Sequence, residues 1–225
     1  MPTFILIPGA GGIAWYWHRL IPLLEALGHE AIAMDLPADD PKAGLNDYAD
    51  HVVKAIGDRP DNILVAQSLA GFVAPLVCAR ASIQKLVFVN AMIPTPHERL
   101  GAWGEATGSA QARREAARQG GYSEEFEEES YFLHDLPPEI ANQAAHHRRD
   151  QAETIWAETC DFAAWPNIPM HVIAGASDRL FPLAFQRRIA RDRLALNVDA
   201  LPGGHLIALS QPTELAKQLA AYLRR

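Results

Sequence analysis

The stretch Asn62-Ile63-Leu64-Val65-Ala66-Gln67-Ser68-Leu69-Ala70-Gly71-Phe72-Val73 decides the fold of this chain. An apolar run that leads into small-x-Ser-x-small, and then into helix-forming residues, is typical of a strand that turns sharply into a helix with the serine at the apex. The positions two before and two after such a serine come close together, so only small side chains fit. Ala66 and Ala70 meet this requirement, although glycine is usual there. The pattern predicts Ser68 at the apex; the alternative is an ordinary helix N-cap.

The composition limits the class of protein. The 225 residues suffice for one sizeable core, and 20 basic against 27 acidic residues give a net charge of -7. This charge disfavours nucleic acid and anionic membranes as partners. Cys78 and Cys160 support neither a disulfide framework nor a metal site, and the adjacent His146 and His147 cannot share a helix face. With no leader-like start and no long apolar run, we expect a cytoplasmic protein without a bound metal.

Apolar runs alternate with helical patterns along most of the chain. This alternation predicts a mostly parallel sheet of about six strands flanked by helices. The expected strands are 4–7, 31–34, 63–66, 86–89, 170–175 and 196–201, and the expected helices are 15–27, 45–56, 69–80, 185–194 and 212–225. The alternation stops in an alanine-, charge- and aromatic-rich part of the chain. We therefore expect a core formed by residues 1–92 and 166–225, with residues 93–165 inserted as a small helical cap.

Three polar residues follow predicted strands at the edge where ligands bind in parallel sheets. Ser68, Asp178 and His205 occur in that order along the chain. A serine hydroxyl needs a base to become a nucleophile, and the base needs a carboxylate that fixes its tautomer and stabilises the imidazolium. The sequence therefore predicts a catalytic triad in which Ser68 attacks, His205 carries the proton and Asp178 orients His205.

The oxyanion formed by such an attack needs two backbone N–H groups. One is expected from Leu69, directly after the nucleophile, and the other from the loop after the first strand, at Ala10. The neighbouring Trp15 and Trp17, and Trp103 and Phe132 in the cap, are candidates for the substrate pocket, with core packing as the alternative role for these aromatic residues.

The loop after the first strand also fits a rival hypothesis. Residues Gly9 to Ala14 match G-x-G-x-x-A, and Asp35 ends the next strand where a dinucleotide fold places its ribose-binding acid. A nicotinamide-dependent reductase is therefore an alternative. The chain lacks a Tyr-x-x-x-Lys pair, and this alternative leaves the Ser, Asp and His pattern unexplained.

The quoted residues also resemble a known family. Residues 8–17 (PGAGGIAWYW), the Gln67-Ser68-Leu69-Ala70-Gly71 turn, Asp178 with Phe181-Pro182, and Gly204-His205 are similar to the plant methyl esterase and hydroxynitrile lyase family of α/β-hydrolases and its bacterial relatives. The resemblance covers both ends of the chain and hardly touches the cap. It implies an α/β-hydrolase fold and a serine hydrolase mechanism.

The chain departs from that family at several positions. The family usually has histidine where Pro8 and Gln67 stand, and its lyase branch has threonine and lysine where Ala10 and Leu206 stand. We therefore expect an esterase rather than a lyase: a serine hydrolase that cleaves a small neutral carboxylic ester through an acyl-enzyme, with no metal or organic cofactor. A slow-turnover ligand receptor on the same fold is the other alternative.

The cap suggests which esters fit. Its aromatic side chains can roof an apolar pocket, and its acidic run repels anions. The aromatic residues are Trp103, Tyr122, Phe126, Tyr131, Phe132 and Trp156, and the acidic ones are Glu124, Glu125, Glu127, Glu128 and Glu129.

Overall fold

The computed structural model describes residues 2–224 and contains a six-stranded sheet in which every neighbouring pair is parallel. The strands lie in the order β2-β1-β3-β4-β7-β8. They are β1 (Thr3–Ile7), β2 (Glu30–Ala33), β3 (Asn62–Gln67), β4 (Ile83–Val89), β7 (Met170–Gly175) and β8 (Val198–Leu201). The predicted mostly parallel sheet of about six strands is confirmed. The quoted stretch supplies β3, which pairs with β1 on one side and with β4 on the other.

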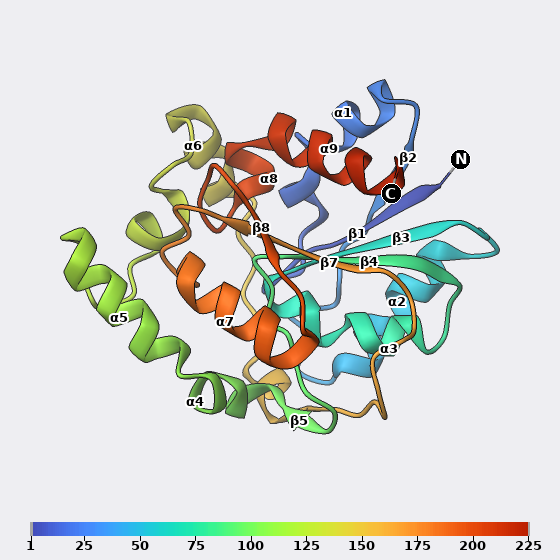
Figure 1. Cartoon of the computed structure of the whole chain (residues 1–225), viewed down its shortest axis with the longest axis horizontal. Coiled ribbons are helices and arrows are strands. Elements are labelled where there is room, and N and C mark those ends of the chain that lie inside the picture. The colour runs from blue at the N-terminus through green and yellow to red at the C-terminus, as the bar shows by residue number, and fades with distance from the viewer. Residues whose placement is uncertain (1, 225) are drawn as a thin grey trace.

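Both faces of the sheet are covered by helices (Figure 1). Phe4 and Leu6 of β1 pack on one side with α1 (Ile21–Ala26), α8 (Ile207–Ser210) and α9 (Pro212–Ala221). Ile5 and Ile7 pack on the other side with α2 (Leu45–Ile56), α3 (Ala74–Cys78) and α7 (Leu183–Leu194). Successive side chains of a strand point to opposite faces, so a continuous apolar run fits a strand that is buried on both sides.

Helix α2 illustrates how the sequence sets these elements. Its buried residues recur at helical spacing, which puts them on the face toward the sheet: Leu45, Tyr48, Ala49, Val52 and Ile56. Asp47 accepts the N–H of Gly44 at its start (2.8 Å), and Gly57 follows its end with φ of 57°. Local caps and an apolar stripe together define this helix.

Two predicted helices are shorter and broken in the structure. The expected helix 15–27 consists of a 3-10 turn (Ala14–Trp17) followed by α1, and the expected helix 69–80 consists of a 3-10 turn (Ser68–Phe72) followed by α3. Pro22 and Pro75 lie in the first turns of α1 and α3, where a missing N–H costs nothing. The expected closing helix is α9 plus a 3-10 turn (Tyr222–Arg224), and residue 225 lies outside the described residues.

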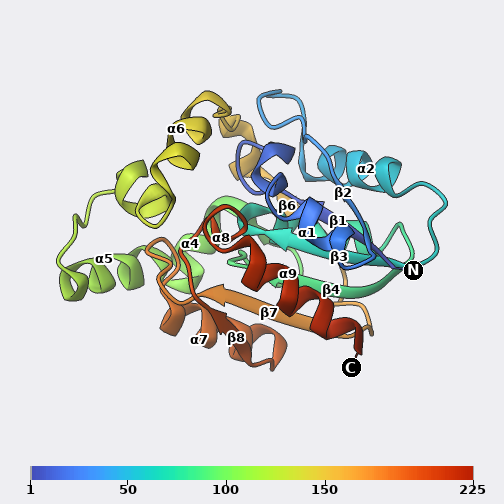
Figure 2. The ribbon, with the colours of Figure 1, turned by 90° about the horizontal axis from the view of Figure 1, so that it is seen from above.

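Residues 93–165 place their α-helices beyond the carboxyl ends of the strands (Figure 2). They form α4 (Trp103–Thr107), α5 (Ser109–Gly120), a π-helical turn (Glu129–Leu133), α6 (Pro138–His146) and two 3-10 turns (Leu100–Ala102 and Glu153–Ala157). The short strands β5 (Glu98–Arg99) and β6 (Thr159–Cys160) pair antiparallel near the two ends of this insertion. That residues 93–165 form a separate cap stays a prediction. Within residues 2–224, no helix has the length and apolar character needed to cross a membrane.

Candidate active site

Ser68 lies at a sharp turn between β3 and the following 3-10 turn. Its φ is 52°, which is the left-handed region and costs a residue with a side chain about 1–3 kcal/mol. The turn brings backbone segments into contact: a Cβ on Gly71 would lie 1.9 Å from the carbonyl oxygen of Met92, and the N–H of Met92 donates to the Ser68 carbonyl at 2.9 Å. Ala66 and Ala70 are fully buried in this turn. These close approaches explain the small residues of the pattern.

The three predicted triad residues form one hydrogen-bonded chain. Nε2 of His205 lies 3.1 Å from Oγ of Ser68, and Nδ1 of His205 lies 2.9 Å from Oδ2 of Asp178. All three side chains are buried, with Ser68 9% exposed. The carboxyl ends of β3, β7 and β8 place these residues at one edge of the sheet. A buried imidazole between a hydroxyl and a carboxylate is suited to take a proton from the hydroxyl.

The carboxylate of Asp178 is held in place on both oxygens. Oδ1 accepts the N–H groups of Leu180 (2.8 Å) and Phe181 (2.9 Å), while Oδ2 accepts from Gln186 Nε2 (3.2 Å) as well as from His205. A carboxylate oxygen can accept more than one hydrogen bond, so these donors fix the orientation of the Asp178 side chain. Asp178 is therefore oriented to bind the Nδ1–H of His205.

Asn90 is a site residue that sequence reasoning did not assign. Its Nδ2 donates to the carbonyls of Gly204 and His205, both at 3.0 Å, and its Oδ1 accepts the N–H of Gly175 at 2.7 Å. Gln186 also donates to Oδ1 (3.2 Å), which links this network to Asp178. Asn90 follows β4 at the functional edge of the sheet with φ of 46°, and this position is the signal that could have identified it.

The inserted segment also contacts the histidine side of the site. Oδ2 of Asp135 accepts the N–H of Gly204 at 2.6 Å, and the ring of Phe132 stacks on the imidazole of His205 with centroids 5.1 Å apart. Nε2 of His134 lies 3.1 Å from the carbonyl of Ser177. Burial, followed by the nearby Arg179 guanidinium, lowers the pKa of His134. A neutral His134 can donate its Nε2–H to Ser177 next to Asp178.

The loop after β1 crosses directly over the nucleophile. A Cβ on Gly9 would lie 2.8 Å from Cβ of Ser68, and the N–H of Gly12 donates to the carbonyl of Gly9 at 3.0 Å. Among the described residues, the N–H of Ala10 donates to no acceptor. Leu69 is the second residue of the 3-10 turn that begins at Ser68. The assignment of Ala10 and Leu69 as oxyanion donors stays a prediction.

The same loop does not support the dinucleotide alternative. Oδ1 of Asp35 accepts the N–H of Ala14 at 2.7 Å, so the acid serves the loop itself. Counting only strands of the large sheet, the order is 2-1-3-4-5-6, whereas the dinucleotide fold has 3-2-1-4-5-6. The glycines are instead explained by close backbone approach.

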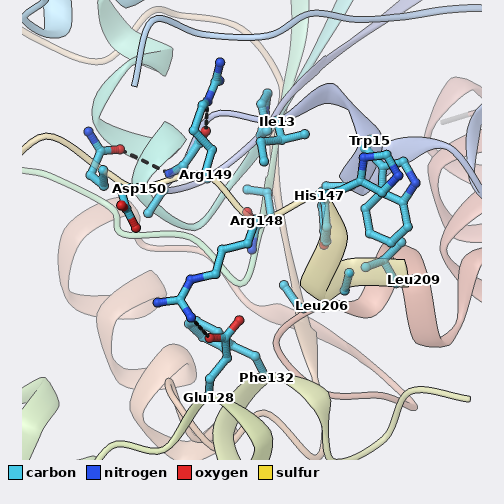
Figure 3. Close-up of a pocket in the computed structure, with 18 of the residues that line it drawn as sticks. Ile13, Trp15, Glu128, Phe132, His147, Arg148, Arg149, Asp150, Leu206 and Leu209 are labelled. Carbon is cyan, nitrogen blue, oxygen red and sulfur yellow. Dashed lines mark hydrogen bonds and ion pairs between the residues drawn. The ribbon is translucent and has the colours of Figure 1, made fainter. Parts of the chain in front are cut away.

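A cavity of about 710 Å³ opens beside the site (Figure 3). Gly9, Ala10 and Gln67, which flank Ser68, line it, together with residues of the insertion. Trp15 and Phe132 line this cavity, and their role in substrate binding stays a prediction; Trp15 stacks on His147 with ring centroids 4.6 Å apart. Phe126 and Trp156 line it as well. The cavity therefore combines the β1 loop, Gln67 next to Ser68, residues that follow His205 and the inserted segment.

Trp17 and Trp103 do not line this cavity, contrary to the sequence expectation. Trp17 is fully buried on the α1 side of the sheet core. Trp103 is 2% exposed, packs edge-on against Phe181 and Phe185, and donates its Nε1–H to the carbonyl of Ile93 at 3.0 Å. Core packing, the alternative role, accounts for both.

The charged residues of the cavity largely compensate each other. Arg148 and Arg149 face three carboxylates, and Nη1 of Arg148 pairs with Oε2 of Glu128 at 2.9 Å (Figure 3). Of the five acidic residues in the predicted run, only Glu128 lines the cavity. The three carboxylates are Glu128, Asp150 and Glu153. The two arginines were not predicted as site residues, because nothing local in the sequence marks them.

Comparison with known proteins identifies relatives. Residues 4–218 match the family described as alpha/beta hydrolase. The chain is 34% identical over 103 residues to alpha-hydroxynitrile lyase of Arabidopsis thaliana, covering 40% of each protein. It is 31% identical over 113 residues to polyneuridine aldehyde esterase of Rauvolfia serpentina, covering 43% of this chain and 41% of the relative. The match thus spans about two fifths of the length of these curated relatives.

A solved structure shows the same fold over the whole chain. An extracellular alpha/beta-hydrolase from a Paenibacillus species superposes with a TM-score of 0.80 over 98% of both chains, at 19% identity. At that identity the likeness concerns the fold alone.

Proposed function

The chain belongs to the alpha/beta hydrolase family, and from this premise we propose that it is a serine hydrolase that cleaves small neutral carboxylic esters through an acyl-enzyme. The observation that carries the proposal is the buried chain from Ser68 through His205 to Asp178, with contacts of 3.1 and 2.9 Å. Relatives named as esterases, such as polyneuridine aldehyde esterase, support the reaction class.

The proposed reaction follows from the positions of the donors and acceptors. Oγ of Ser68 attacks the ester carbonyl carbon while Nε2 of His205 takes its proton, and Asp178 stabilises the imidazolium that forms. His205 then returns the proton to the leaving alcohol, and the acyl group stays on Ser68. Water, deprotonated by His205, releases the acid and restores Ser68. The N–H groups of Ala10 and Leu69 are proposed to bind the oxyanion in both steps.

The substrate class is inferred from the cavity. Aromatic and aliphatic side chains supply much of its lining, which favours apolar acyl and alcohol groups at roughly 25 cal/mol per Å² removed from water. These side chains include Ile13, Trp15, Phe132, Leu206 and Leu209. Two arginines against three carboxylates leave a small negative excess, which repels anionic substrates. We therefore expect small to medium neutral esters to be preferred over dicarboxylates and phosphate esters.

Covalent labelling tests the mechanism directly. A fluorophosphonate probe is expected to modify the wild-type protein, and mass spectrometry of the digest should find the adduct on Ser68. The Ser68→Ala variant should not be labelled and should lose roughly three to six orders of magnitude in kcat, because triad members act as a unit. An adduct on another residue, or near-normal turnover by the variant, would contradict the assignment.

A second measurement tests the substrate class. Values of kcat/KM are compared across esters that share one leaving group and differ in acyl length and charge. Faster cleavage of anionic than of neutral members would contradict the proposed preference. Absence of turnover on every ester, despite labelling of Ser68, would favour the ligand-receptor alternative.

A further inference from the structure

One side chain from the end of the insertion binds the loop after β1. Nε of Arg149 donates to the carbonyl of Gly11 (2.8 Å), and its Nη2 donates to the carbonyls of Gly12 and Leu36 (both 2.6 Å). Arg149 belongs to the stretch that follows α6, here called the return segment (residues 147–152). The planar guanidinium offers five donors in a fixed arrangement, so it can hold three carbonyl oxygens at once.

A second residue of the return segment binds the same loop. Oε1 of Gln151 accepts the N–H of Gly11 at 3.3 Å, and its Nε2 donates to the carbonyl of Ala38 (3.0 Å) and to the hydroxyl of Tyr48 (2.8 Å). The N–H and the carbonyl of Gly11 are therefore both fixed by the insertion. Tyr48 and Ala38 in turn connect the return segment to the core.

Close packing against the return segment requires glycine at position 11, and close packing against the core requires it at position 12. A Cβ on Gly11 would lie 2.7 Å from the carbonyl oxygen of Arg149, and one on Gly12 would lie 2.8 Å from Cβ of Leu36. Gly11 and Gly12 also have φ of 78° and 58°, which side chains disfavour. The pattern that suggested a dinucleotide site instead permits the return segment to pack against the loop.

This packing leaves the N–H of Ala10 available at the cavity. The N–H of Gly11 is bound by Gln151 and that of Gly12 by Gly9, whereas that of Ala10 has no acceptor among the described residues. Ala10 is exposed and lines the cavity. The N–H of Ala10 shares a peptide plane with the carbonyl of Gly9, which accepts the N–H of Gly12, so the anchors of Gly12 help to set the direction of the Ala10 N–H.

We propose that Arg149 is a positioning residue for acyl transfer: through the carbonyls of Gly11 and Gly12 it fixes the loop so that the Ala10 N–H meets the developing oxyanion. This inference rests on the proposed serine hydrolase function. Two of the three donated hydrogen bonds go to carbonyls of this loop and the third goes to Leu36 after β2, so Arg149 ties the loop to the core and acts on the reaction through the loop. The oxyanion site is consequently complete only while the return segment is docked on the core.

The test compares Arg149→Ala and Arg149→Lys with Arg188→Ala. Arg188 is a matched control, because its Nη2 also joins the insertion to the core through a carbonyl, that of Thr107 at 2.5 Å, but away from the loop. Each variant is assayed for kcat and KM on a neutral aryl ester. Its affinity for an aryl trifluoromethyl ketone, which forms a tetrahedral oxyanion adduct with the serine, is measured in parallel. Hydrogen exchange of residues 9–14 reports on the loop without reference to activity.

The expected result separates positioning from stability. Arg149→Ala should lower kcat roughly 10- to 100-fold with little change in KM. A misplaced oxyanion donor should lower kcat by no more than the loss of that donor would. Affinity for the ketone should fall by the same factor, and residues 9–14 should exchange faster. Arg149→Lys keeps the positive charge but loses the planar set of guanidinium donors, so its kcat and ketone affinity should lie between those of the wild type and of Arg149→Ala. This variant also provides the test if the alanine variant does not fold. Arg188→Ala should retain wild-type kcat and ketone affinity.

Three outcomes would overturn the inference. One is wild-type kcat and ketone affinity in both Arg149 variants. Another is an equal loss of kcat in Arg188→Ala, which would indicate that general docking of the insertion matters rather than this residue. The third is unchanged exchange of residues 9–14. Failure of the wild-type protein itself to react with esters or fluorophosphonate would contradict the proposed function instead. The wild-type protein is assayed first, so this failure is separated from a failure of the Arg149 inference.

Discussion

The two sides of the candidate active site are held by different parts of the molecule. The loops that carry Asp178 and His205 are bound mainly from within the core, by Asn90 and Gln186, and the insertion adds the contacts of Asp135 and His134. The loop that carries Ala10 is bound by Asp35 and Leu36 of the core at Ala14 and Gly12, and by Arg149 and Gln151 of the insertion at Gly11 and Gly12. Asp178 and His205 thus keep several core anchors without the insertion, whereas both the N–H and the carbonyl of Gly11 in the oxyanion loop are bound by residues of the insertion. Breaking each side separately tests this difference.

The largest effect is expected on the core side, from Asp178→Asn. The amide cannot stabilise the imidazolium and favours the wrong tautomer of His205, so kcat should fall roughly 10⁴-fold with little change in KM. Steady-state kinetics on a neutral ester measure this. The control is Asp135→Asn, because an amide oxygen can still accept the N–H of Gly204 at that position. An Asp178→Asn enzyme with almost normal kcat would require another carboxylate as the partner of His205.

Asn90→Ala is expected to affect stability more than any single change on the insertion side. It leaves buried backbone groups of Gly175, Gly204 and His205 without their partner, and each such group costs about 1–3 kcal/mol before relaxation. We expect the free energy of unfolding to fall by about 3 kcal/mol. Urea denaturation measures the loss.

The matched variant on the insertion side is Gln151→Ala. Gln151 is half-buried, so water can replace part of its bonds to Gly11 and Ala38, and we expect a loss of only about 1 kcal/mol. Equal losses of unfolding free energy in Asn90→Ala and Gln151→Ala would show that the core and the insertion stabilise the site to the same degree, which would contradict the expected difference.

The smallest effect concerns access to the nucleophile. Phe132 covers the His205 ring and Ser68 is only 9% exposed, so Phe132→Ala should raise the second-order rate of fluorophosphonate labelling, by roughly fivefold if about 1 kcal/mol of obstruction is removed. Phe126→Ala is the control, since Phe126 packs edge-on against Phe132 and is 51% exposed. A labelling rate that falls, or that rises equally in the control, would contradict the role of Phe132 as the cover.

The sequence alone was enough to predict the sheet and the three polar residues Ser68, Asp178 and His205 at its edge. Apolar runs of four to eight residues mark strands buried on both faces whatever their neighbours are, and the small residues around Ser68 are a local requirement of a tight turn. Asp178 and His205 could be located because parallel strands end at one edge, so position after a strand predicts position in space. The helix predictions were less accurate: the expected helices 15–27 and 69–80 each begin with a 3-10 turn, and Pro22 and Pro75 lie in the first turns of the shorter α-helices that follow.

Only the tertiary structure decided which aromatic residues face the cavity and which side chains brace the loops. Trp15 and Trp17 are two residues apart, yet one lines the cavity and the other is fully buried, because burial depends on what packs against each face. Asn90 meets Gly204 across 114 residues, and Arg149 meets Gly11 across 138. Such pairs leave no periodic or local pattern, since a hydrogen bond between distant segments depends on where the fold brings them together.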